Sequence, residues 1–252
     1  MMRSWYCLII VFLANVSFAM DFTCQKIIEE NESYTHCENK IAEYPEAINY
    51  FIPKNLIEID KVIINIHFQG HNINGYNPLK NFGNLLINSQ KNAIIIAPIS
   101  KGKCETFDQY FAKEARGNEL LSKLVNDLNL ENVSVSFSGH SGAYRVLRTI
   151  FGYKDLSIKD QLIGVGLFDA TYSDVSVIVN FAKANSEFVF YNSFVGGANG
   201  SADEISIELR KKYQNLSHFY FEELKTDSKK TVLDQHFELL QIFGLTQFLE
   251  KL

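Results

Sequence analysis

Short runs rich in β-branched and aromatic residues alternate with helical patterns along most of this chain, and the alternation restricts the folds open to it. The runs are bounded by Gly, Asn or Pro, as buried strands commonly are, and cover residues 61–68, 92–98, 132–138, 162–169, 187–193 and 217–224. Helical patterns cover residues 118–130, 142–152, 201–216 and 236–252. The sequence therefore predicts an α/β fold in one domain, with a mostly parallel central sheet and helices on both faces.

The first 19 residues have the layout of a secretory signal peptide. Arg3 precedes an apolar run over residues 5–14, and Ser17-Phe18-Ala19 supplies small residues for cleavage after Ala19. The run is short for a membrane span, so an uncleaved anchor is the less favoured alternative. We therefore expect a secreted or periplasmic protein with no stable membrane span after cleavage. Residues 20–60 are predicted to form an N-terminal cover segment with early strands, and 61–252 the α/β core.

The charge balance argues against a polyanionic partner. Acidic residues number 29 against 24 basic ones, which gives a net charge of −5 that becomes −6 when Arg3 is removed. The charges are scattered and form no basic stripe, so we expect no nucleic-acid partner. The cysteine spacing fits no zinc pattern, and we expect neither a metal nor an organic cofactor.

Three of the four cysteines lie beyond the predicted cleavage site. Export implies an oxidising compartment, so we favour a disulfide between Cys24 and Cys37, with Cys104 free or buried. A bridge between Cys37 and Cys104 stays open as the alternative.

One strand runs directly into a helix at a serine. The stretch "VSVSFSGHSGAYRVL" covers residues 133–147 and places Ser141 between small residues at the junction. A nucleophilic serine needs a hydroxyl clear of its neighbours, a base to take its proton and amide N–H groups for the oxyanion. A sharp turn after a strand provides the first, and it needs small residues around the serine. The junction therefore indicates a nucleophile, Ser141.

Residues 139–143, Gly-His-Ser-Gly-Ala, resemble the G-x-S-x-G nucleophile elbow of the α/β-hydrolase family, with Ala143 where glycine is commoner. The resemblance covers roughly residues 61–252. It implies a triad in the chain order serine, acid, histidine. His236, after the last predicted strand and just before the last helix, matches the position of the family's catalytic histidine. His36, His67, His71, His140 and His218 lie in the cover segment, strands, the first loop or the elbow.

The acid is less determined by the sequence. Asp169 ends the predicted strand at 162–169, where α/β proteins place their sites. Asp203 follows the next strand after a glycine-rich loop and equally suits the first turn of a helix. Asp174 suits a helix start, and Asp234 lies too close to His236 in sequence. We favour Asp169 and keep Asp203 as the alternative.

The resemblance also implies an oxyanion hole. One amide would be that of Gly142, the residue after the nucleophile. The other would come from the loop "QGHNING", residues 69–75, which is similar to the family's H-G-x loop. Gly70 takes the glycine position, His71 would donate its backbone N–H, and Gln69 replaces the usual histidine.

These residues predict an exported serine hydrolase that transfers an acyl group from a small ester or acylated substrate to water. Esters are easier substrates than amides for this scaffold. A peptidase or amidase acting on exported or cell-wall peptides is the second interpretation, and a non-catalytic hydrolase-like binding protein is the third. We expect residues 75–92 and 104–117 to set the size of the acyl pocket.

Overall fold

The computed structural model describes residues 22–56, 61–71, 79–197, 201–225, 227–240 and 244–252. The predicted signal peptide, residues 1–19, lies outside the described residues, so export stays a prediction. Within the described part of the chain, none of the helices is both long and apolar enough to cross a membrane.

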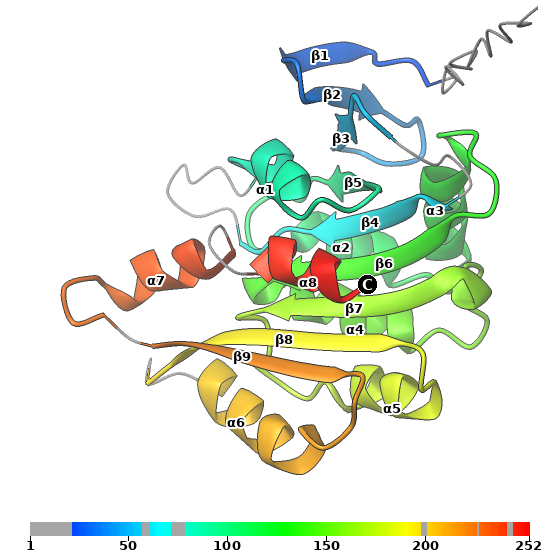
Figure 1. Cartoon of the computed structure of the whole chain (residues 1–252). Helices are drawn as coiled ribbons and strands as arrows, with labels where there is room; N and C mark the ends of the chain where they lie inside the picture. The colour runs from blue at the N-terminus through cyan, green and yellow to red at the C-terminus, as the bar shows by residue number, and fades with distance from the viewer. Residues whose placement is uncertain (1–21, 57–60, 72–78, 198–200, 226, 241–243) are drawn as a thin grey trace, which may run out of the picture.

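One nine-stranded sheet organises the described chain, in the order β1-β2-β3-β5-β4-β6-β7-β8-β9 (Figure 1). All pairings from β5 to β9 are parallel, and β1, β2 and β3 add an antiparallel edge. The mostly parallel sheet predicted from the sequence is confirmed. The strands are β1 (Lys26–Glu30), β2 (Tyr34–Lys40), β3 (Ala47–Pro53), β4 (Ile63–Phe68), β5 (Ala93–Pro98), β6 (Ser134–His140), β7 (Leu162–Phe168), β8 (Val189–Gly196) and β9 (Phe219–Lys225).

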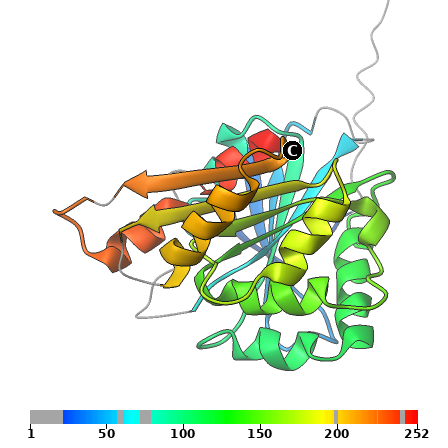
Figure 2. The same ribbon diagram turned by 90° about the horizontal axis from the view of Figure 1, so that it is seen from below.

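Helices cover both faces of this sheet, as predicted (Figure 2). One face carries α2 (Glu105–Phe111), α3 (Glu114–Asn126), α4 (Tyr144–Phe151), α5 (Ser176–Ala184) and α6 (Ser201–Tyr213). The other carries α1 (Phe82–Asn88), α8 (Leu245–Lys251) and the end of α7 (Val232–Leu239). The chain between residues 236 and 252, predicted as one helix, instead contributes to both α7 and α8.

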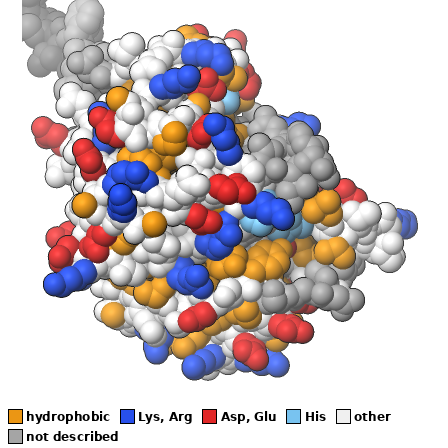
Figure 3. Space-filling view, turned by 180° about the vertical axis from the view of Figure 1, so that it is seen from behind, with side chains coloured by type: hydrophobic (Ala, Val, Ile, Leu, Met, Phe, Trp, Pro, Cys, Tyr) orange, Lys and Arg blue, Asp and Glu red, His pale blue; other side chains and the backbone are white. Residues whose placement is uncertain are grey.

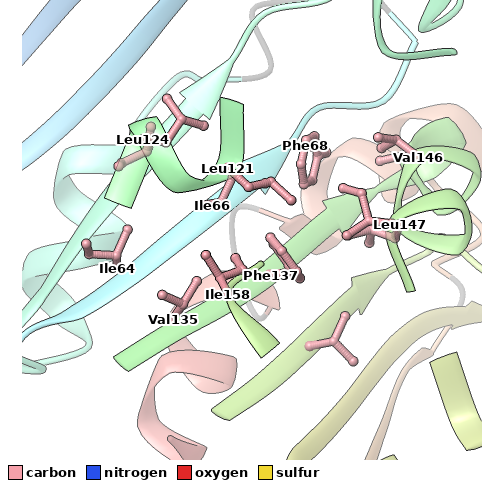
Figure 4. Packing of buried hydrophobic residues seen from close by; sticks show 14 of the residues in the cluster. Ile64, Ile66, Phe68, Leu121, Leu124, Val135, Phe137, Val146, Leu147 and Ile158 are labelled. Carbon is pink, nitrogen blue, oxygen red and sulfur yellow. The ribbon is translucent and has the colours of Figure 1, made fainter. Parts of the chain in front are cut away.

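The first face buries a core of branched and aromatic side chains. Ile64, Ile66 and Phe68 alternate along β4 and meet residues of β6, α3 and α4 (Figure 4). Because both faces of the central strands are covered, their sequences are nearly continuous apolar runs.

On the opposite face of the sheet, β4 and β6 carry a buried network of hydrogen-bonded polar side chains. The Ser138 hydroxyl donates to Asn65 Oδ1 at 2.8 Å, so it accepts from His67 Nδ1, also at 2.8 Å. His67 Nε2 is buried with no hydrogen-bond partner among the described residues. Desolvation lowers the pKa of His67 to about 3, which keeps its imidazole neutral.

A disulfide joins the segment before β1 to β2. Cys24 and Cys37 form a disulfide with their Cα atoms 5.6 Å apart, and Cys104 is free and buried. The favoured pairing is therefore confirmed, and the Cys37–Cys104 alternative is wrong. β3 pairs antiparallel with β5, so residues 26–53 continue the same sheet. The division of the chain at residue 61 stays a prediction.

Candidate active site

Three loops meet at one edge of the sheet because the strands before them are adjacent and parallel. Phe68 at the end of β4 is in register with Gly139, and His140 at the end of β6 with Phe168. The next residues along the chain include His71, Ser141 and Asp169. The carboxyl edge of the sheet thus gathers the predicted site residues, as expected for parallel α/β folds.

Ser141 occupies a strained turn. Its φ is 55°, in the left-handed region that a residue with a side chain rarely adopts. Ser141 directly follows the last residue of β6 and begins a short 3₁₀ turn, Ser141–Ala143, that leads into α4. A Cβ atom on Gly139 would lie 2.7 Å from Leu147 Cδ1 and 3.0 Å from the Ala143 Cβ. Because Gly139 has no side chain, Ala143 fits in place of the commoner glycine.

The loop after β4 packs directly on this turn. A Cβ atom on Gly70 would lie 2.6 Å from the Ser141 Cβ, so only glycine allows the approach. The His71 ring lies against Gly142, since a Cβ atom on Gly142 would lie 2.4 Å from His71 Nε2. The backbone N–H groups of Gly142 and His71 as oxyanion donors stay a prediction.

Gln69, the departure from the common pattern, has a structural role. Its side chain is buried, and its Nε2 donates to the Ser100 carbonyl at 2.9 Å. This bond ties the start of the loop to the segment after β5. The loop that holds Gly70 against Ser141 is therefore anchored by Gln69 in place of a histidine.

Asp169, and not Asp203, hydrogen-bonds to His236. His236 Nδ1 and Asp169 Oδ2 are 2.5 Å apart, and the residues are 7 % and 5 % exposed. The Asp169 backbone N–H donates to the Ser193 carbonyl at 2.7 Å, and the Val195 N–H donates to Asp169 Oδ1 at 3.4 Å. These bonds hold the carboxylate toward the imidazole.

The sequence predicted His236 in a loop just before the last helix, and this prediction is wrong. His236 lies inside α7, Val232–Leu239, and not in a loop before the helix. Thr231 begins this helix, because its side chain and that of Asp234 form a capping box. The helix therefore starts one turn earlier than the sequence pattern indicated.

The other two aspartates have local roles at helix starts. Asp174 Oδ1 accepts from the Ser176 N–H at 2.8 Å, just before α5. Asp203 lies in the first turn of α6. Neither bonds to an imidazole among the described residues.

Tyr172, which no sequence motif indicated, also contacts the Asp169–His236 pair. Its hydroxyl lies 3.3 Å from Asp169 Oδ2, to which it donates, and 3.4 Å from His236 Nδ1. Desolvation, with the Asp169 charge second, raises the pKa of Tyr172 above its usual range, so the hydroxyl stays protonated and available as a donor. A tyrosine three residues after the candidate acid, in the same segment after β7, is the signal in the sequence.

His140, which precedes Ser141 in the elbow, packs against His236 and hydrogen-bonds to its backbone. The imidazole rings are 4.4 Å apart between centroids, and the His140 Nε2–H donates to the His236 carbonyl at 2.9 Å. Burial, with the nearby His236 as the second cause, holds the pKa of His140 well below its usual value. A neutral His140 therefore fixes the backbone of His236.

A pocket of about 620 Å³ opens over these residues. Figure 3 shows histidine atoms at the surface of one face, bordered by hydrophobic side chains and a basic side chain. The described residues that line the pocket are His71, Ser141, Gly142, Tyr144, Arg145, Asp169, Tyr172, Val195, Ala202, Asp203, Val232, Leu233 and His236.

All five predicted site residues line this one pocket. No hydrogen bond joins Ser141 to His236 among the described residues, and such bonds are often long in unliganded sites. The expected source of the pocket wall is not supported: of residues 75–92 and 104–117, none that the structure describes lines it. The wall comes instead from α4 and from the segments after β7, β8 and β9.

The described part of the chain holds no group of three or more His, Cys, Asp or Glu side chains arranged to bind a metal ion. The polar side chains of the described residues at the pocket are one serine hydroxyl, two imidazoles, two carboxylates, two tyrosine hydroxyls and one guanidinium.

Comparison with known proteins identifies the fold. No family model matches the sequence, and neither does any curated protein. Solved structures do match. A CIB-like hydrolase from Thermoplasma acidophilum aligns with a TM-score of 0.56 at 13% identity, over 87% of this chain and 100% of that chain.

Two esterase structures match similarly. An esterase from Thermogutta terrifontis aligns with a TM-score of 0.52 at 9% identity, over 84% of this chain and 91% of that chain. A feruloyl esterase module from Clostridium thermocellum aligns with a TM-score of 0.52 at 11% identity, over 88% of this chain and 94% of that chain. With the sheet order and the strained serine turn, these matches show that the chain has the α/β-hydrolase fold.

Proposed function

We propose that this protein is a serine hydrolase that cleaves a small ester or acylated substrate. One observation carries the proposal: the hydrogen-bonded His236–Asp169 pair opens onto the same pocket as Ser141 in its left-handed turn. A serine projected from a strained turn, near an imidazole oriented by a buried carboxylate, is the arrangement of a nucleophile with its base.

The reaction would have two steps, acylation of Ser141 and hydrolysis of the acyl-enzyme. Ser141 Oγ attacks the ester carbonyl while His236 Nε2 takes the hydroxyl proton, and Asp169 holds the Nδ1–H on the opposite side of the ring. The C–O bond to the alcohol then breaks, and His236 returns the proton to the leaving alkoxide. Water hydrolyses the acyl-enzyme by the same steps, which frees the acid and restores Ser141.

The backbone amides of Gly142 and His71 would hold the carbonyl oxygen as it gains charge. The close approach of Gly70 to Ser141 supports this role, because it brings the loop that carries the His71 amide beside the nucleophile. The His71 ring is neutral near pH 7, since desolvation first, and Arg145 and Lys103 next, lower its pKa.

An ester is favoured over a peptide by the character of the pocket. Its wall beyond the proposed catalytic groups is mostly apolar and aromatic: it consists of two tyrosines, Val195, Ala202, Val232 and Leu233, with Arg145 and Asp203 as its charged members. Two of the matching structures are named as esterases. Export is supported by the signal-like start of the sequence and by the Cys24–Cys37 disulfide.

Hydrolysis of p-nitrophenyl butyrate by wild type and Ser141→Ala tests the proposal. Loss of the nucleophile in such triads lowers turnover on the order of a millionfold, and we expect activity to fall to background with the thermal transition unchanged. Ser122→Ala, in α3 and away from the pocket, is the matched control and should retain full activity. Activity of Ser141→Ala within tenfold of wild type would contradict the proposal.

A further inference from the structure

Asp203 is a buried carboxylate that the proposed mechanism does not use. It lies in the first turn of α6, is 7 % exposed and lines the pocket. Its Oδ1 accepts from the Glu204 N–H at 2.9 Å. Its Oδ2 has no hydrogen-bond or ion-pair partner among the described residues and is not fully buried.

The pocket that Asp203 lines is mostly apolar and aromatic. Val195, Ala202, Val232 and Leu233 line the same pocket, and the rings of Tyr144 and Tyr172 lie 6.3 Å apart between centroids. A carboxylate in such a place costs free energy unless a cation or donors pair with it. Aromatic faces attract organic cations as well.

The other charges at the pocket are already paired. Asp169 is bonded to His236. The Arg145 guanidinium forms an ion pair with Asp108 at 2.8 Å and donates to the Lys103 carbonyl, while its Nε is buried with no hydrogen-bond partner among the described residues. Asp203 is thus the charged pocket residue with no ion-pair partner among the described residues.

Val232 and Leu233 extend this subsite toward solvent. Each is about half exposed, at 50 % and 48 %, on the first turn of α7. Aliphatic side chains of this kind pack well against methyl groups. They supply no ligand atoms for a metal ion. The combination of one carboxylate, aromatic rings and aliphatic side chains fits an alkylated ammonium group.

We propose that Asp203, with Tyr144 and Tyr172, forms a subsite for an organic ammonium group, and that the enzyme prefers esters that carry a cationic amine or quaternary ammonium. The inference rests on the proposed function and names the substrate class of the same site. Asp203 is a specificity residue here, because it contacts the cationic end of the substrate and not the reacting carbonyl.

A pair of isosteric inhibitors isolates the charge. Choline and 3,3-dimethylbutan-1-ol differ by the replacement of N⁺ with carbon, and their inhibition constants are measured against p-nitrophenyl butyrate. Wild type should bind choline at least about tenfold more tightly than the neutral alcohol. Asp203→Asn keeps the shape and the bond from Glu204, and it should abolish this preference.

Glu204→Gln is the matched control, because Glu204 is the neighbouring carboxylate but is exposed and does not line the pocket. It should keep the preference for choline. Equal binding of the two compounds by wild type, or an equal preference in wild type and Asp203→Asn, would overturn the subsite.

The proposed ammonium subsite can be tested separately from the proposed hydrolase activity. If wild type hydrolyses no ester, the proposed function fails, and calorimetry with choline alone then decides the subsite. Binding by wild type that disappears in Asp203→Asn would support it, and absence of binding by wild type would overturn it.

Discussion

His236 and Asp169, 67 positions apart in the sequence, lie with Nδ1 and Oδ2 2.5 Å from each other. One residue follows β7 directly, and the other lies in α7 beyond β9. Their meeting depends on the parallel order of β7, β8 and β9, which brings both segments to one edge of the sheet. The pair gives His236 a defined orientation, and in the proposed mechanism Nε2 takes the serine proton.

Replacing Asp169 by Asn should preserve the shape of the site while favouring the wrong imidazole tautomer. The comparable change in a serine protease lowers turnover about ten-thousandfold, and we expect a loss of similar order. Asp203→Asn, which breaks no contact with His236, should change turnover of a neutral ester by less than about threefold. Turnover of both variants on p-nitrophenyl butyrate decides; the reverse ranking would show Asp203 to be the acid.

Tyr172→Phe removes a hydroxyl that donates to Asp169 and lies near His236 Nδ1. A hydrogen bond to a charged group contributes about 1.5–3 kcal/mol, and this long one belongs near or below the lower end, so kcat should fall roughly fivefold to tenfold. If Tyr172 had only a structural role, its replacement would leave the pH dependence of kcat/KM unchanged. We expect the acid limb of kcat/KM to move, and an unmoved limb with unchanged kcat would refute the role.

Gly70→Ala should disable the site without unfolding the protein. The new Cβ would lie 2.6 Å from the Ser141 Cβ and 2.8 Å from the His140 carbonyl oxygen, so the loop must move away from the nucleophile. A displacement of about 1 Å in such a site can cost a hundredfold in rate, and we expect at least that loss. Gly152→Ala, whose nearest contact would be 3.2 Å, is the control. Full activity of Gly70→Ala would argue against an oxyanion role for this loop.

The two buried neutral histidines should make stability fall in acid. The pKa of His67 is lowered to about 3 in the folded state from 6.5, so the unfolded chain binds a proton that the folded one does not. Stability is therefore full above about pH 6.5 and falls as the pH drops toward 3, by about 1.4 kcal/mol per pH unit for each such group. His140 acts in the same direction.

Urea unfolding at several pH values measures this slope. His67→Asn removes one of the two groups, so its free energy of unfolding should vary less steeply between pH 6 and pH 4 than that of wild type. An identical slope in the two proteins would show that His67 does not contribute.

The strands and the elbow could be predicted from the sequence because buried parallel strands leave apolar runs and the turn demands small residues. Other features depend on contacts that no local pattern records. α1 and α2 begin after Asn81 and Cys104, both in left-handed conformation and without side-chain caps, so the usual start signal is missing. The bond between Asp169 and His236 depends on strand order, and this is why Asp203 stayed open until the fold was known.

Labelling with a fluorophosphonate probe, followed by mass spectrometry of the tryptic peptides, tests the nucleophile most directly. The probe bonds covalently to a serine that a neighbouring base has activated. The account predicts one adduct, on the peptide that contains Ser141, and its absence in Ser141→Ala. An adduct on another serine, or no adduct on folded wild type, would contradict the central claim.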